Sequence, residues 1–421
     1  MSAPTVESAA HGDEVEETEA LTLLDALARA PAAAALVVAA LNRNDRRALR
    51  LAHTQLRDAV GEATTKLELE TRFNAAGPAR PPTARRWPRL EQLIMHDPDV
   101  EAFTALGSDT WGSLRSLRVG RMFIADFFGT PRARALAAAL RRMPALRALE
   151  LREVELSDDA AAALFRASSG EDVPQLRALT IVSAELSLAA ARALAASGWK
   201  LEELCLRFNF NLRAAGVAAL VVAPSFALRR LNLSYCGLDT AALHALARAP
   251  WPLEELTLTC NDFSAPAAGP ALAALSRHAS LRRLTVDGCR LTAAGFQALV
   301  EAAWPALASL SAQGANVASE GPHVLSAAAF AGFPALEELD LYNVPLGEAG
   351  ARLLASQRWA RLRELNLQLS QLGAAGLAAL ARGAWPALEL LDVRHNGLGA
   401  LALEDVRRWA PALVELRQGS S

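Results

Sequence analysis

A short leucine motif recurs along most of this 421-residue chain and limits the folds that it can adopt. The pattern L-x-x-L-x-L is clearest in LRRLNLSYCGL from Leu228 and LELLDVRHNGL from Leu388. Successive copies start 24 to 32 residues apart. The thirteen copies begin at Leu90, Leu114, Leu146, Leu176, Leu201, Leu228, Leu253, Leu281, Leu307, Leu336, Leu362, Leu388 and Leu413. A period of this length indicates a stack of similar supersecondary units.

Each copy is expected to form one strand and one helix. Apolar and polar positions alternate within the motif, which predicts a short strand with one buried face. The segment that follows, such as LTAAGFQALVEAAW from Leu291, has apolar residues at helical spacing. One such unit cannot bury its apolar side alone, so neighbours must stack. Parallel strands lie about 4.8 Å apart whereas helices need about 8 to 10 Å, so we expect an α/β solenoid curved into a horseshoe, with parallel inner strands and outer helices.

The copies resemble leucine-rich repeats of the ribonuclease-inhibitor type, with the core L-x-x-L-x-L-x-x-N/C-x-L and a glycine near the helix start. The resemblance covers residues 62–417 and implies a horseshoe of about thirteen repeats. The helix-start glycines are Gly216, Gly295, Gly350 and Gly376. The N/C position holds Asn209, Cys236, Asn261, Cys289 and Asn396, but Met122, Val154, Ala184, Ala315, Val344 and Ser370 in other copies. In those other copies the turn lacks this side-chain partner, so we expect other groups or water to satisfy the buried backbone.

Tryptophans and cysteines fit the same pattern. Every tryptophan lies just before a repeat start, often followed by proline, which predicts a structural role at the end of a helix. These residues are Trp87, Trp111, Trp199, Trp251, Trp304, Trp359, Trp385 and Trp409. Cys236 and Cys289 occupy one repeat position two repeats apart, about 10 Å at strand spacing. That separation exceeds the roughly 7 Å limit for a disulfide, so both should be free, buried thiols.

Composition and charge narrow the compartment and the partner class. The chain carries 43 basic and 45 acidic residues, so no broad basic surface predicts a nucleic-acid partner. The longest uncharged apolar run, residues 31–41, is shorter than the roughly 20 residues of a membrane span, so no membrane partner is expected. Residues 1–20 are an acidic tail without a basic n-region, and four cysteines in so long a chain fit a reducing compartment. We expect a cytoplasmic protein; a nuclear or cytoskeleton-associated location stays open.

Residues 21–61 precede the repeats and are predicted to be helical, with two interpretations. They form a cap that shields the first repeat, or they form an F-box. The run from Leu41 through Asp45 and Leu49 resembles the second half of an F-box, although the Leu-Pro-x-Glu opening is missing and Leu56 replaces a common Trp. F-boxes followed by repeats of this type recur in substrate receptors. The resemblance implies that residues 30–60 bind the adaptor of a cullin-RING ubiquitin ligase through an apolar face formed by Leu36, Val37, Leu41 and Leu49. Residues 418–421 form a C-terminal tail.

Candidate binding residues follow from the strand periodicity. Side chains two, four and six residues after each motif start should lie on the inner, concave face of the horseshoe. The middle repeats place Arg207, Arg230 and Arg283 there, with Phe208 and Tyr235 just beyond their strands. The C-terminal repeats contribute Glu338, Asp340, Tyr342, Glu364, Asp392, Arg394 and His395. The first group is mixed and basic, and the second is mainly acidic, a composition typical of protein-binding surfaces.

The motifs of common enzymes and cofactor sites are missing. The sequence contains no G-x-x-x-x-G-K-[ST], G-x-S-x-G, H-E-x-x-H or G-x-G-x-x-G, and its seven histidines show no metal-ligand spacing. We therefore expect no catalysis, no metal and no cofactor. The primary hypothesis is a non-catalytic scaffold that binds a protein partner on its concave face. The alternative is an F-box substrate receptor of a cullin-RING ubiquitin ligase.

Overall fold

The computed structural model describes residues 65–70, 84–85, 87–120, 128–166, 176–315, 325–397 and 408–419. These residues divide into two compact units, which meet in sequence at Gly120 and again within residues 134–176. The acidic tail and the helical or F-box-like segment, with Leu36, Val37, Leu41 and Leu49, lie outside the described residues.

The first unit begins with three parallel strands in chain order. The first strand pairs with the second, with Lys66 opposite Gln92, and the second pairs with the third, with His96 opposite Gly120. Helix α4 starts where the Asp99 carboxylate accepts a hydrogen bond from the Ala102 amide at 2.7 Å. The elements are β1 (Lys66–Glu70), β2 (Gln92–His96), α4 (Val100–Gly107), β3 (Ser116–Gly120) and α5 (Thr130–Leu140), which the unit boundary divides at Ala135.

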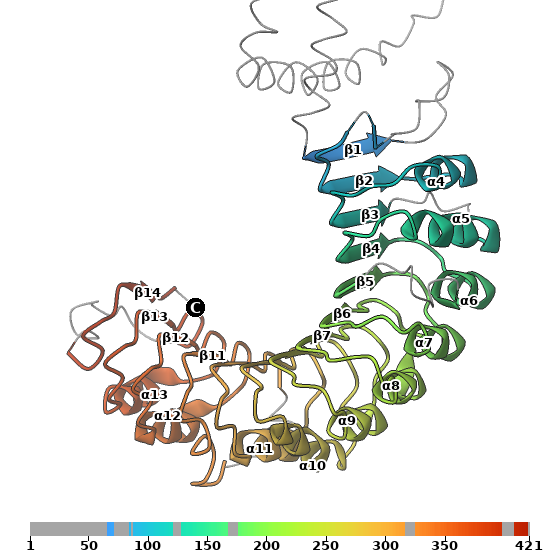
Figure 1. The fold of residues 1–421 in the computed structure, drawn as a ribbon. Helices are drawn as coiled ribbons and strands as arrows, with labels where there is room; N and C mark the ends of the chain where they lie inside the picture. The colour runs from blue at the N-terminus through green and yellow to red at the C-terminus, as the bar shows by residue number, and fades with distance from the viewer. Residues whose placement is uncertain are drawn as a thin grey trace, which may run out of the picture. The chain divides into compact units, whose positions relative to one another are not determined.

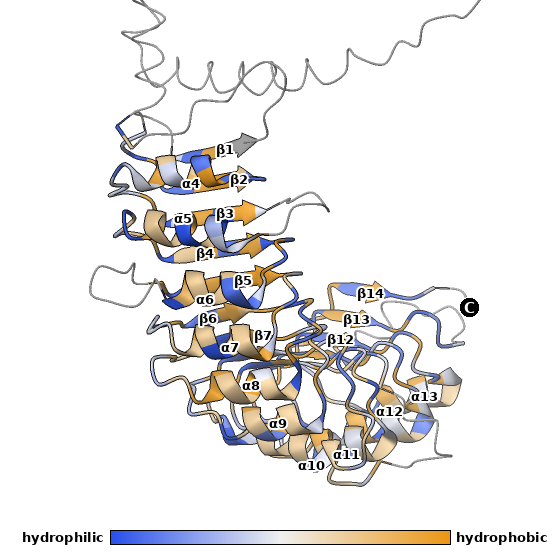
Figure 2. Ribbon diagram, turned by 90° about the vertical axis from the view of Figure 1, so that its right-hand side faces the viewer, coloured by the Kyte–Doolittle hydropathy of each residue, from blue (hydrophilic) through white to orange (hydrophobic). Residues whose placement is uncertain are grey.

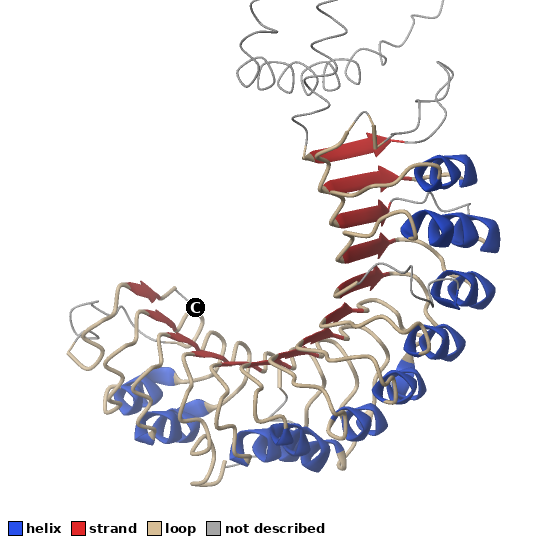
Figure 3. Cartoon of the chain, in the orientation of Figure 1, coloured by secondary structure: helices blue, strands red, loops and turns tan. Residues whose placement is uncertain are grey.

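The second unit contains eleven strands that are parallel and paired in chain order, from β4 to β14. The strands line the inner side of an open arc, and the helices line its outer side (Figure 1, Figure 3). The strands are β4 (Ala148–Arg152), β5 (Ala178–Val182), β6 (Glu203–Cys205), β7 (Arg230–Asn232), β8 (Glu255–Thr257), β9 (Arg283–Thr285), β10 (Ser309–Ser311), β11 (Glu338–Asp340), β12 (Glu364–Asn366), β13 (Leu390–Asp392) and β14 (Glu415–Arg417). The helices are α6 (Asp158–Arg166), α7 (Leu188–Ala195), α8 (Arg213–Val221), α9 (Thr240–Leu246), α10 (Ala268–Ala273), η1 (Ala274–Arg277), α11 (Ala293–Glu301), α12 (Gly347–Ser356) and α13 (Gly373–Leu380).

This alternation of parallel strands with outer helices confirms the predicted α/β solenoid. The sheet of the described residues has fourteen strands, one more than the thirteen copies of the motif. The additional strand is β1, whose sequence KLELE lacks the opening leucine of the motif. Within the described residues, no helix is long and apolar enough to cross a membrane.

Leucines form the core between strands and helices. The central leucine of each strand is in register with those of its neighbours, as Leu204, Leu231 and Leu256 are. These three side chains are at most 3% exposed. Burying such a side chain contributes about 1.5 to 3 kcal/mol. On the outer side, alanine-rich helices such as α8 (RAAGVAALV) pack beside their neighbours and are mostly pale orange, the colour of moderate hydropathy, in Figure 2.

A ladder of asparagines closes the turn after the strands. Asn209 accepts hydrogen bonds on Oδ1 from the amides of Ala184 and Leu186, at 3.1 and 3.0 Å. Its Nδ2 donates to the carbonyls of Ile181 and Leu206, at 2.9 and 2.8 Å. Asn261 and Asn396 make the same four bonds in their own repeats. One side chain thus satisfies four buried backbone groups in two adjacent repeats.

Other residues at the ladder position act differently. The thiols of Cys236 and Cys289 are free and buried, as predicted, and each donates to a carbonyl of the preceding repeat at 3.0 Å. The prediction that Ser370 provides no side-chain partner is wrong, because its Oγ donates to the Leu341 carbonyl at 3.3 Å. At Ala184, which has no polar side chain, the backbone replaces the missing partner: the Ala184 carbonyl accepts a hydrogen bond from the Leu156 amide of the preceding repeat at 3.1 Å. Met122 lies outside the described residues.

Six tryptophans are buried at the junctions between helices and strands, with exposures of 4% or less: Trp111, Trp199, Trp251, Trp304, Trp359 and Trp385. Trp87 and Trp409 are half-buried. The indoles of Trp111 and Trp304 each donate to the carbonyl five residues earlier, at 3.1 and 2.9 Å. Each of these two bonds ties a tryptophan to the last turn of its helix, which supports the structural role expected from the sequence.

Candidate protein-binding surface

The solvent-facing side chains of β4–β14 form the surface that we call the concave face. Because the strands are in register, equivalent residues of successive repeats lie side by side, about 4.8 Å apart. The row two residues after the motif start reads Glu203, Arg230, Glu255, Arg283, Ser309, Glu338, Glu364, Leu390 and Glu415. The row four residues after it reads Cys205, Asn232, Thr257, Thr285, Ser311, Asp340, Asn366, Asp392 and Arg417.

The middle repeats neutralise their own charges. Arg230 forms an ion pair with Glu203 of the preceding strand, and Arg283 pairs with Glu255 at 3.0 Å. The hydrogen bond that Arg230 donates to the Glu203 carboxylate raises the pKa of Arg230 above its ordinary value. These exposed pairs add little stability, but they leave Arg230 and Arg283 with less charge to offer a partner. The middle of the concave face is therefore less basic than the sequence suggested.

The C-terminal repeats enclose a concavity of about 290 Å³ on the same face. Glu338 and Glu364 are exposed register neighbours on its wall, and within the described residues neither carboxylate has a cationic partner. The lining residues are Ser309, Leu310, Ser311, Glu338, Leu339, Asp340, Glu364, Asn366, Leu390, Asp392 and Arg417. This end of the concave face thus carries two carboxylates without a cationic partner among the described residues.

Two of the predicted acidic residues are held by neighbouring groups. Asp340 accepts hydrogen bonds from the Tyr342 amide, the Asn366 amide side chain and Gln313, each at 3.0 Å. The Asp392 side chain is only 2% exposed and binds Arg394, with Nη2 to Oδ2 at 2.6 Å. This carboxylate raises the pKa of Arg394. The sequence places Asp392 on the face correctly, but its neighbour covers it.

Asp287, which the sequence did not single out, lies beside this concavity. Its Oδ1 accepts from the Ser311 hydroxyl at 2.6 Å and from the Gln313 amide at 2.9 Å. Burial raises the pKa of Asp287 above its ordinary value, and the charge of Asp340 acts in the same direction. The negative charge at this end of the face is thus held at a free-energy cost.

A cluster of aromatic rings lies at the end of β6 and β7. The rings of Phe208 and Tyr235 stack with centroids 4.5 Å apart, and Phe210 meets Tyr235 edge-on at 6.4 Å. The guanidinium of Arg207 lies 5.1 Å from the centre of the Phe208 ring. The structure thus joins three predicted residues with Phe210, which sequence reasoning missed. The available signal was a phenylalanine outside the leucine pattern, two residues after Phe208.

The residues beyond the strands share one backbone conformation. Seven residues after the motif start, Phe208, Tyr235 and His395 have φ angles of 62°, 56° and 56°. In two repeats the same position is a glycine, Gly288 or Gly314. His395 is exposed and Tyr342 is half-buried. This left-handed turn directs the chain away from the sheet, which explains why its side chains lie at the rim of the concave face.

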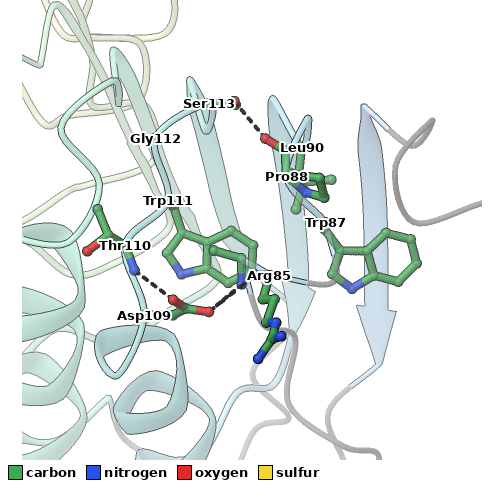
Figure 4. A pocket seen from close by; sticks show the side chains of 10 residues that line it. Arg85, Trp87, Pro88, Leu90, Asp109, Thr110, Trp111, Gly112 and Ser113 are labelled. Carbon is green, nitrogen blue, oxygen red and sulfur yellow. Dashed lines mark hydrogen bonds between the residues drawn. The ribbon is translucent and has the colours of Figure 1, made fainter. Parts of the chain in front are cut away.

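The first unit contains a separate pocket of about 290 Å³, shown in Figure 4. Oδ2 of Asp109 accepts hydrogen bonds from the amides of Ala84 and Arg85, at 2.8 and 3.4 Å. Ser113 donates to the Pro88 carbonyl at 2.8 Å. Because the Asp109 carboxylate is already bound to backbone amides, we interpret this pocket as a junction between loops of adjacent repeats.

The chain is similar to one family model and to two solved structures among those compared. A family model described as "Leucine Rich repeat" matches residues 362–381. A chain of the TLR13–ssRNA13 complex aligns with a TM-score of 0.47 and 20% identity, over 78% of this chain and 42% of that chain. A chain of the yeast Rad7–Elc1 complex aligns with a TM-score of 0.43 and 15% identity, over 98% of both chains. No curated protein matches the sequence.

The strand order, the leucine core and the asparagine ladder together define a leucine-rich repeat solenoid. The matched segment, residues 362–381, contains β12 and the whole of α13.

Proposed function

We propose that this protein is a non-catalytic scaffold for protein–protein interaction and that its concave face binds a protein partner. The observation that carries the proposal is the concavity of the C-terminal repeats, with the uncompensated carboxylates of Glu338 and Glu364 on its wall. Like charges directly opposite on adjacent strands repel each other. A partner that brings a lysine or arginine between them relieves this repulsion, so we expect a basic segment to bind here.

The rest of the face supports binding rather than chemistry. The polar groups around the concavity hold one another, as Asp392 holds Arg394, which fixes their positions before a partner arrives. Within the described residues, no three His, Cys, Asp or Glu side chains lie close enough to hold a metal ion. We expect neither a cofactor nor an enzymatic activity, and we expect a protein rather than a nucleic acid or a membrane as the partner.

The test compares capture of cellular proteins by the full-length chain and by two charge-matched variants. Glu338→Lys with Glu364→Lys reverses the charge of the concavity. Glu101→Lys with Asp159→Lys makes the same change in net charge on exposed residues of helices α4 and α6. We expect one protein to be retained by the wild type and the control and lost from the concavity variant. Equal capture by all three proteins would refute the proposed binding face.

The finer assignments from the sequence stay proposals. They are the ribonuclease-inhibitor type of repeat, the division at residues 20, 61 and 417, and a cytoplasmic location. The alternative function is a substrate receptor whose residues 30–60 bind a cullin-ligase adaptor. Full-length protein and a variant without residues 1–61 test it: adaptor that co-purifies only with the full-length protein supports the F-box, and its absence from both supports a cap.

A further inference from the structure

The aromatic cluster forms a second surface, distinct from the acidic concavity. We define the aromatic edge as Arg207, Phe208, Phe210 and Tyr235. We propose that the aromatic edge binds a peptide segment of a protein partner in which a carboxylate lies next to an apolar side chain. This proposal rests on the scaffold function above and specifies the chemistry of a partner at another part of the same unit.

Exposure of Phe210 is the first observation. Its side chain is 57% exposed, and every other aromatic residue that the structure describes is half-buried or buried. The other described phenylalanines, apart from the half-buried Phe208, are buried in the core. An exposed phenylalanine next to two half-buried rings offers a partner apolar area at low cost in conformational entropy.

The aromatic edge is also held in place before binding. Phe208 and Tyr235 stack at an interplanar angle of 18°, and Phe210 packs against Tyr235 at 80°. Phe208 and Tyr235 occupy the left-handed position of two successive repeats, where bulky side chains are uncommon. Other repeats have glycine or non-aromatic residues such as Cys260, Asn343 and Leu369 at this position, so the fold does not require a ring there. The two rings are therefore free to serve a binding role.

Arg207 supplies the charge of the site. It is exposed and lies over the Phe208 ring, and within the described residues no carboxylate pairs with it. Arg230 of the next repeat, in contrast, is already paired with Glu203. A guanidinium stacked on a ring keeps its N–H edge free for two parallel bonds to a carboxylate. The side chains at this edge therefore match a peptide with one acidic and one apolar group.

The stacking favours a peptide over a single-stranded nucleic acid. Binding of successive bases needs several free ring faces. Phe208 and Tyr235 cover each other, and Arg207 lies over Phe208, so fewer faces remain for bases. The chain as a whole carries a formal charge of −2, which does not attract a phosphate backbone.

Selection from a phage library of random peptides about twelve residues long, on the full-length protein, tests the proposal. We expect enriched peptides with Asp or Glu within about three residues of Phe, Leu, Ile or Met. Their synthetic versions should bind Phe210→Ala and Arg207→Ala about tenfold more weakly or worse. The matched controls Val222→Ala, at a 76% exposed valine, and Arg192→Ala, at an exposed arginine of α7, should bind normally.

Several outcomes would overturn the proposal. These are no enriched peptide family on the wild type, equal affinity of the Phe210→Ala and Arg207→Ala variants, and equal affinity of peptides with Asp and Glu changed to Asn and Gln. Binding of a uridine 12-mer RNA that Phe210→Ala abolishes would assign the edge to nucleic acid instead. A cellular partner that is lost from the Glu338→Lys/Glu364→Lys variant but retained by Phe210→Ala would leave the scaffold function intact and refute this inference alone.

Discussion

Replacement of one ladder asparagine should destabilise the fold far more than its size suggests. Asn261 is 4% exposed and makes four hydrogen bonds to backbone groups of its own and the preceding repeat. Asn261→Ala removes all four bonds and leaves two N–H groups and the Leu233 carbonyl without a partner, whereas the Leu258 carbonyl keeps its bond from the Cys289 thiol. At about 0.5 to 1.5 kcal/mol for each bond, the expected loss is about 2 to 6 kcal/mol in the free energy of unfolding.

Urea unfolding of the full-length protein, followed by circular dichroism, measures this loss. The exposed Asn211→Ala serves as the control and should change the free energy by no more than about 0.5 kcal/mol. Asn261→Cys should fall between the two, because the thiol of Cys236 makes one comparable bond, to the Leu206 carbonyl. A loss below about 1 kcal/mol for Asn261→Ala would show that water or local relaxation replaces the ladder, which would contradict our account of how the turns are held.

Three further predictions concern packing, pH and thiols. Gly332→Ala should destabilise the protein by about 1 to 3 kcal/mol in urea unfolding, because the new Cβ would collide with the backbone carbonyl of Ala302. Asp287→Asn should raise the free energy of unfolding at pH 7, because burial raises the pKa of this carboxyl and its ionised form is disfavoured in the folded state. Cys236 and Cys289 should resist a thiol reagent in the native protein at pH 8, because burial raises the pKa of both to about 12.

Each of these predictions has a contrasting case. An added Cβ at Gly112 meets no atom within 4 Å, so Gly112→Ala should be close to neutral, and equal losses for both glycines would contradict the packing argument. Because the pKa of Asp287 is raised in the folded state, the wild-type protein loses stability as pH rises and this carboxyl ionises. Below about pH 3.9, the ordinary pKa of aspartate, the carboxyl is protonated in both the folded and unfolded states, so the gain from Asp287→Asn should vanish. A gain that persists at pH 3 would exclude ionisation as its cause. The half-exposed Cys205 and Cys260 should react first, and equal rates for all four thiols would contradict the buried assignment.

The sequence predicts the solenoid because each leucine of the motif has one structural role. Period two within the motif places Leu204 in the core and Glu203 on the face, and the structure agrees. Strand β1 escaped detection because one residue of the pattern, its opening leucine, is missing. The ion pair of Arg230 with Glu203 could have been predicted from the sequence, because both residues lie two positions after a motif start. The prediction requires that neighbouring repeats be compared at this position.

Other features of the surface depend on side-chain contacts that the repeat pattern does not reveal. Asp392 is 2% exposed and forms an ion pair with Arg394, whose side chain reaches back to it from two residues further on. The aromatic edge needs the left-handed turn, which brings Phe208 and Tyr235 of different repeats into contact. The glycines Gly288 and Gly314 indicate that turn in the sequence, but only after the repeats are aligned on their strands.

The alternating ion pairs of the middle repeats favour one order of the units over another. The central leucines of these strands recur in every repeat, so they distinguish one order of repeats from another only weakly. The row Glu203, Arg230, Glu255, Arg283 does distinguish them. Exchange of the repeats that carry Arg230 and Glu255 would place glutamate beside glutamate and arginine beside arginine. A chain with these two repeats exchanged would therefore keep its core leucines but lose the ion pairs between neighbouring strands. The order of these repeats is thus favoured by charges on the concave face and not by the leucines beneath it.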